Sequence, residues 1–139
     1  MNISVKIEGA PELMSRLGDL ADRARMQRAL AAAGEVVSAD AKANCPVDTG
    51  YLRNSIAVQV DGNSAVIGPS ASYGIFVEFG TGAKGDTSVA HTSKKSWTYY
   101  SRGRFYTTSG QPARPFLVPA LKNNVAEIAR RFREAYGNG

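Results

Sequence analysis

The chain has 139 residues, of which 43% are hydrophobic and 21% charged, as in an ordinary globular domain. A single cysteine, Cys45, excludes an internal disulfide and fits a reducing compartment. No stretch approaches the roughly 20 apolar residues of a membrane span, and the first ten residues lack the apolar run of a signal peptide. The sequence therefore predicts one domain, residues 1–139, made in the cytosol.

The net charge of +5 is concentrated in one segment, residues 84–114. That segment contains a single acidic residue, Asp86. Its six basic residues are Lys84, Lys94, Lys95, Arg102, Arg104 and Arg114. Because the remaining basic and acidic residues are equal in number, the segment carries the whole net charge on a neutral body.

Hydrophobic periodicity predicts the N-terminal half in chain order. Alternating apolar residues indicate a strand over residues 2–8, and leucines at helical spacing indicate a short helix over 13–20. A longer, alanine-rich helix is expected over residues 26–44, and Pro46 stops it.

The next segment predicts a β-hairpin. Residues 55–60 and 64–68 alternate with period two around Asp61-Gly62, a strong turn signal. Residues 73–80 are ambiguous, because their apolar residues fit both a strand and one face of a helix.

Residues 81–114 form an inserted arm, in which residues 101–103 separate two β-prone halves. A single helix is expected over residues 115–137, with Pro115 in its first turn and Gly137 at its end. The predicted fold is α+β: a small antiparallel sheet packed against a long helix and a C-terminal helix, with a long extended loop or β-hairpin arm.

Asp48-Thr49-Gly50 matches the signature of the aspartic proteases, in which two chains can each contribute one Asp. Such an Asp must end an apolar strand and lie beside a second carboxylate. Here it follows a helix and Pro46, so the favoured interpretation is a turn in which Asp48 and Thr49 accept hydrogen bonds from the following amides. A dimeric aspartic protease using Asp48 remains the alternative.

Two further motifs lack the context that their chemistry needs. Residues 80–85, G-T-G-A-K-G, match G-x-G-x-x-G, but no apolar helix follows, and no acid lies between Asp86 and Glu127 to hold a ribose. His91 is the only histidine, so no His-based metal cluster is available. Cys45 beside Pro46 is expected to be a small buried hydrophobe. We expect no catalytic residue, cofactor or metal.

The arm mixes cations with rings, a combination that suits either nucleic acid or a protein interface. Protein contact is favoured, and a small basic nucleic-acid-binding module is a further alternative. The expected interface residues are Lys94, Lys95, Trp97, Tyr99, Tyr100, Arg102, Arg104, Phe105 and Tyr106.

Three fragments, CPVDTGYLRNSI, VIGPSASYGIFVEFGTG and QPARPFLVPAL, follow a helix in this order. Together they resemble the gene-product-ten-like family of tailed-phage tail components, also called tail-completion or head–tail joining proteins. The resemblance spans residues 26–131, and the arm between Thr81 and Gln111 is longer than the family's usual loop. The matching residues are Pro46, Asp48, Thr49, Gly50, Leu52 and Arg53, then Tyr73, Val77, Glu78, Phe79, Gly80 and Thr81, then Pro112, Pro115, Phe116, Leu117, Pro119, Ala120 and Leu121.

The resemblance implies a structural virion protein of a long-tailed phage or prophage, assembled in the bacterial cytoplasm. Such proteins lie at the neck, complete the tail and help to join it to the head, and they are not enzymes. The implied partners are other copies in a ring, expected to be a hexamer, and neighbouring neck and tail proteins. DNA passing through the lumen is a further candidate, whereas no membrane or small-molecule substrate is implied.

The motif residues also have a physical interpretation. Gly50 and Gly80 suit turns, and Leu52, Phe79 and Phe116 suit the core. Glu78 stands among apolar residues, and a buried acid needs a cation or several amide donors. Arg53 and Arg114 are the candidate cations.

Overall fold

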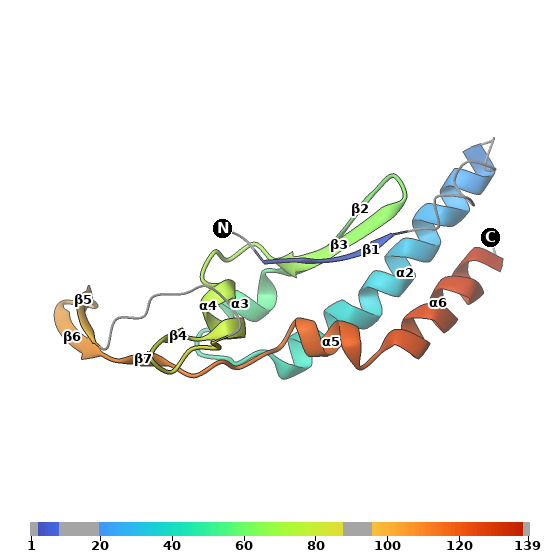
Figure 1. Ribbon diagram of the computed structural model, residues 1–139. Coiled ribbons are helices and arrows are strands. Elements are labelled where there is room, and N and C mark those ends of the chain that lie inside the picture. Colours follow the sequence, from blue (N-terminus) through green and yellow to red (C-terminus); the bar gives the residue numbers. More distant parts are fainter. Residues whose placement is uncertain (1–2, 9–19, 88–95, 138–139) are drawn as a thin grey trace.

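The computed structural model describes residues 3–8, 20–87 and 96–137, so residues 13–19 of the short helix expected over 13–20 lie outside it, as do Lys94 and Lys95. The fold is α+β, as predicted, and is elongated (Figure 1). The elements are β1 (Val5–Glu8), α2 (Leu20–Asn44), α3 (Tyr51–Asn54), β2 (Ile56–Asp61), β3 (Ser64–Pro69), α4 (Gly74–Phe79), β4 (Thr81–Gly82), β5 (Trp97–Ser101), β6 (Arg104–Thr108), β7 (Gly110–Gln111), α5 (Val118–Lys122) and α6 (Val125–Gly137).

Helix α2 forms the middle of the body, with the sheet on one side and α6 on another (Figure 1). It is longer than predicted, since it begins at Leu20 rather than near residue 26. Because two sides of the helix are covered, its apolar residues are spread around it rather than confined to one stripe, and small and medium side chains suit this close packing. Its fully buried hydrophobic residues are Met26, Ala29, Leu30, Ala33, Val37 and Ala41.

The sheet is antiparallel, with strand order β1-β3-β2. Ile67 of β3 lies opposite both Val5 and Val58, so one face of the sheet presents a row of apolar side chains to the core. The predicted hairpin is confirmed, but its turn is displaced by one residue. Asp61 pairs with Ser64, so the two central residues are Gly62 and Asn63.

Residues 74–79 are helical, which resolves the ambiguity over residues 73–80. Gly74 and Glu78 are buried, whereas Tyr73 and Phe76 are exposed. A buried pair four residues apart fits the helical period rather than the strand period. Gly80 ends the helix with φ 75°, and its amide donates to the carbonyl of Phe76 at 2.8 Å.

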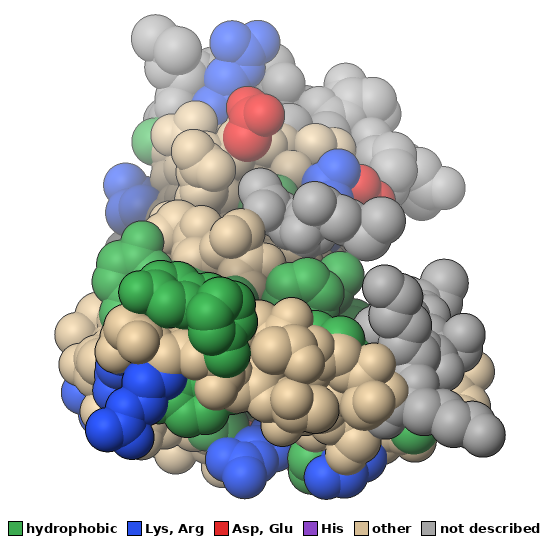
Figure 2. Space-filling view, turned by 90° about the vertical axis from the view of Figure 1, so that its left-hand side faces the viewer, with side chains coloured by type: hydrophobic (Ala, Val, Ile, Leu, Met, Phe, Trp, Pro, Cys, Tyr) green, Lys and Arg blue, Asp and Glu red, His purple; other side chains and the backbone are tan. Residues whose placement is uncertain are grey.

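The described part of the arm contains a β-hairpin, one of the two forms expected, and a second pair of strands closes its base. Thr81 lies opposite Gln111 and Gly82 opposite Gly110. Strands β5 and β6 turn at Arg102-Gly103, and both residues have positive φ, 50° and 81°. This conformation matches the right-handed twist of the strands and favours glycine at the second position. Figure 2 looks onto this end of the molecule, where hydrophobic side chains gather, with Lys and Arg along the lower rim.

The single helix expected over residues 115–137 is wrong: the structure has two helices, α5 and α6, with Asn123 and Asn124 between them. Pro115 lies before the first helix, whose first turn contains Pro119 instead. Asn124 Nδ2 donates to the carbonyl of Ala120 at 2.7 Å and to Asp40 Oδ2 at 2.9 Å. These bonds fix the break against α2, and Val125, the first residue of α6, is 64% exposed.

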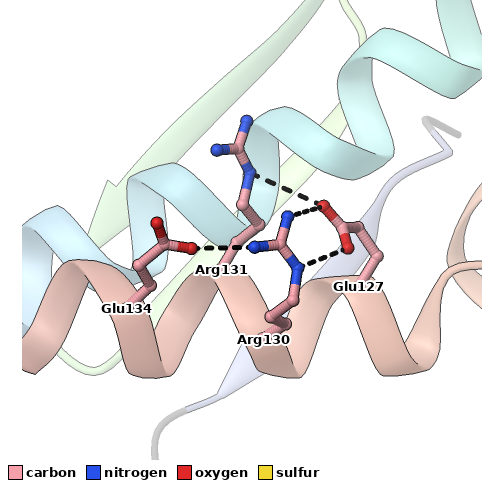
Figure 3. Close-up of polar contacts among 4 residues, drawn as sticks. All are labelled: Glu127, Arg130, Arg131 and Glu134. Atoms are coloured by element: carbon pink, nitrogen blue, oxygen red, sulfur yellow. Dashed lines mark hydrogen bonds and ion pairs between the residues drawn. The ribbon is translucent and has the colours of Figure 1, made fainter.

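Helix α6 carries a cluster of charged side chains (Figure 3), while its Ile128, Phe132 and Tyr136 pack against the core. Arg130 bonds Glu127 at 2.6 and 2.8 Å and Glu134 at 2.9 Å, and Arg131 lies 3.8 Å from Glu127. The hydrogen bonds from Arg130 hold the pKa of Glu127 below its ordinary value. These pairs are exposed, so they support the helix locally rather than fixing its position.

Gly34 marks a close approach of α2 to the sheet. A Cβ placed there would lie 2.6 Å from Val58 Cγ1. We expect Gly34→Val to lower the free energy of unfolding by about 1–3 kcal/mol, because it overpacks this contact. Chemical denaturation measures the loss. The control is Ala39→Val on the exposed side of the same helix; equal losses in the two variants would contradict close packing at Gly34.

Candidate functional site

Glu78 is the most deeply buried charged side chain among the described residues, with 1% of its surface exposed. Its Oε2 accepts hydrogen bonds from the amides of Phe116 at 2.8 Å and Leu117 at 2.9 Å. Its Oε1 accepts from the amide of Val118 at 2.9 Å. The first amides of a helix lack partners within the helix, so Glu78 satisfies donors at the start of α5.

The expected ion pair between Glu78 and Arg53 or Arg114 is therefore wrong. No described arginine pairs with Glu78, and both arginines are exposed. Three amide donors supply the compensation that a cation would otherwise give. The signal in the sequence was Pro119: it marks the start of a helix, and the amides just before such a start need an acceptor.

The Asp48-Thr49-Gly50 segment is a turn, as favoured from the sequence. The Tyr51 amide donates to Thr49 Oγ1 at 3.3 Å, and Gly50 has φ 85°. Asp48 differs from the expectation: its carboxylate contacts Arg102 at 3.8 Å instead of accepting bonds from the following amides. The turn leads into the short helix α3, which the sequence did not predict.

The remaining motif residues fall into structural roles. Leu52 and Phe116 are buried, as expected, but Phe79 is only half-buried and Pro115 is exposed. Thr81 Oγ1 accepts a hydrogen bond from the Gln111 amide at 3.2 Å, which adds to the pairing of β4 with β7 at the base of the arm.

Within the described residues, Asp48 and the G-x-G-x-x-G match lack the surroundings that their motifs require. The Asp48 side chain is 89% exposed, follows helix α2 rather than an apolar strand, and has Arg102 as its ionic partner. Thr81 and Gly82 of the G-x-G-x-x-G match form β4, and no helix follows over residues 83–87. No cluster of His, Cys, Asp and Glu suited to a metal lies within the described residues.

Cys45 is buried, as expected of a small hydrophobe. Burial raises the pKa of its thiol, and the charge of Glu78 adds to this effect while that of Arg53 opposes it. A raised pKa disfavours the thiolate, which is the nucleophilic form.

The arm presents rings on both faces of its hairpin. Tyr99 stacks on Tyr106 at 5.7 Å between ring centroids, and Tyr100 meets Phe105 edge-on at 5.1 Å. Tyr100 and Phe105 are 64% and 76% exposed. Trp97 is half-buried at the base, where a Cβ on Gly82 would lie 2.8 Å from its ring. The hairpin is thus anchored at its base and open at its tip.

A second exposed aromatic surface, missed from the sequence, lies on the body. Tyr51 and Tyr73 stack with their ring centroids 6.2 Å apart, and Val47 and Phe76 are also exposed. Helical spacing over residues 73–79 was the available signal, since it places Tyr73 and Phe76 on the same side. A pocket of about 280 Å³ lies here; its lining includes Val47, Asp48, Tyr51, Tyr73, Gln111 and Arg114.

We expect Glu78→Ala to lower the free energy of unfolding by several kcal/mol, since each buried donor left without a partner costs about 1–3 kcal/mol. Glu78→Gln should be intermediate, because its carbonyl oxygen can still accept while its NH2 group opposes an amide. Denaturant unfolding measures both. Glu134→Ala is the exposed control. A large loss of unfolding free energy in Arg53→Ala, with little loss in Glu78→Ala, would instead favour an ion pair between Glu78 and Arg53.

We expect Asp48→Asn to change the free energy of unfolding by less than about 0.5 kcal/mol, because an exposed ion pair contributes little. Thermal unfolding checks this. A pepstatin-sensitive peptidase activity present in the unaltered chain and absent from Asp48→Asn would instead make Asp48 catalytic.

No helix within the described ranges has both the length and the apolar character needed to cross a membrane. No curated protein and no solved structure matches the chain. One family model matches residues 11–80, and its description reads "Bacteriophage HK97-gp10, putative tail-component". That match covers half of the chain and includes the Asp48 turn, the β2–β3 hairpin and α4. The chain therefore belongs to the family of phage tail components typified by gene product 10 of bacteriophage HK97.

Proposed function

We propose that this tail component completes the tail at the neck of a long-tailed phage and helps to join it to the head, as a ring of identical copies. Membership of the tail-component family supports a role in the virion. The observation that carries the finer role is the arm, which is anchored at its base and presents exposed rings on both faces of its hairpin.

Exposed aromatic patches of this kind mark sites where a partner binds. The chain presents one such patch on the arm and another on the body, around Tyr51 and Tyr73. A contact between two different surfaces of identical chains is heterologous, and repetition of that contact closes a ring when the rotation allows. We expect six copies, with neck and tail proteins above and below.

The role is structural and needs no catalysis. In support, Asp48 lies beside a cation and Glu78 is fully engaged with backbone amides, so neither of these two carboxylates is arranged for proton transfer. The exposed Arg104 suits an acidic surface on a neck partner, with DNA in the lumen as the second candidate. A steep fall of duplex-DNA binding with salt would favour the DNA contact.

Excision of the arm tests the proposal. Gly82 and Gly110 are paired across the base, so Asn-Gly in place of residues 83–109 closes β4 and β7 as a hairpin. We expect the shortened chain to fold, because its core lies outside the arm, but to remain a monomer and fail to complete tails.

Light scattering measures the mass against the 14.8 kDa of one chain. Addition to tails that lack this protein measures joining to heads. Val125→Ser removes an apolar side chain that is 64% exposed on α6, and it is the control for loss of surface apolar area. Normal tail completion by the shortened chain would make the arm dispensable and contradict the proposal.

A further inference from the structure

The two faces of the β5–β6 hairpin differ in chemistry. Strand alternation places Tyr100 and Phe105 on one face together with Thr98 and Thr107, whose hydroxyls share a hydrogen bond of 2.9 Å. Arg104 belongs to the other face, with Tyr99 and Tyr106. The Tyr100–Phe105 face therefore has the most exposed rings of the hairpin and no described cation within its strands.

This uncharged face suits a protein surface better than a nucleic acid. Sites that bind single strands combine stacking rings with cations that follow the phosphates. Here the neighbours of the rings are threonines, whereas protein interfaces are enriched in aromatic residues and depleted of charge at their centre. The face is therefore suited to the centre of a protein contact.

The pocket beside the Asp48 turn has the complementary features. Its mouth carries the exposed rings of Tyr51 and Tyr73, which can pack against further rings in offset or edge-on geometry. Its lining also includes two charged residues, Asp48 and Arg114, and the Asp48 carboxylate is the group that suits a basic arm.

An ion pair already on the molecule shows that the hairpin tip and the pocket rim match in charge. Arg102 lies 3.8 Å from Asp48, and the two side chains are 79% and 89% exposed. Because burial does not fix this pair, Asp48 is accessible to an arginine from another molecule. Exchange of an identical contact between copies has a low energetic cost.

We propose that the Tyr100–Phe105 face of the hairpin docks on the Asp48 pocket of a second copy, with Arg102 paired to Asp48 of that copy. The contact is heterologous, since arm and pocket are different surfaces of the same chain. The inference rests on the proposed function in one respect, because it requires the chain to assemble with itself.

A charge swap between copies tests the inference. Asp48→Arg and Arg102→Asp are made separately and together, and mass is measured at low salt, where exposed charges act most strongly. Arg102 has φ 50°, a conformation that aspartate tolerates, so the turn is retained. At the concentration where the unaltered chain is half assembled, each single variant should lose its assembled fraction.

An equal mixture of the two single variants should regain assembly. Alternating copies bring Arg102 to Asp48 at one contact and the reversed pair at the next. The double variant should also assemble, since every contact then carries the reversed pair. Assembly of the double variant without assembly of the mixture would show that the pair forms only within one chain, and would overturn the inference.

The rings are tested separately. Tyr100→Ser and Phe105→Ser should lose assembly with little change in the thermal unfolding midpoint, whereas Val125→Ser, as exposed as Tyr100, should assemble normally. Normal assembly of all three would overturn the inference alone and leave the ring proposal standing. An unaltered chain that stays monomeric would overturn both. Loss of oligonucleotide binding in Tyr100→Ser with normal assembly would assign the face to nucleic acid and overturn the docking contact.

Discussion

The Glu78 carboxylate and three amides at the start of α5 hold together two segments that lie far apart in the sequence. A carboxylate in a buried place is tolerated only if its lone pairs are used, and amides just before a short helix are tolerated only if they find an acceptor. Each group removes the cost of burying the other. The position of α5, and through it the approach of the C-terminal segment to α2, depends on this exchange.

The same junction explains how the domain accommodates a long insertion. Around Glu78, the Arg114 amide donates to the Val77 carbonyl at 2.8 Å, and Gln111 Nε2 donates to the Phe76 carbonyl at 3.1 Å. Strands β4 and β7 then pair just beyond these bonds. Because the two ends of the insertion are fastened to one another, its length adds little to the cost of closing the loop. The arm can therefore vary in size and chemistry without change to the body.

The sequence predicted the elements whose signal is local. Alternation identified β2 and β3, the alanine-rich period identified α2, and the glycine at position 103 marked the hairpin of the arm. Its failures lie where a distant contact decides. The break between α5 and α6 is fixed by Asn124 on Asp40, and a continuous apolar period cannot reveal it. The partners of Glu78 are backbone amides; Pro119 marks the helix start to which they belong, but nothing in the local sequence identifies Glu78 as their acceptor. The stacking of Tyr51 on Tyr73 was hidden because the two rings come from separate elements.

Trp97 is the only tryptophan of the chain, and it lies half-buried at the base of the arm beside Gly82 rather than in the core. Intrinsic indole fluorescence of this protein therefore reports on the attachment of the arm, and far-ultraviolet circular dichroism reports mainly on the helices of the body. An unfolding curve followed by emission alone would describe the release of a hairpin. Divergence between the two optical signals would separate the melting of the appendage from that of the domain that carries it.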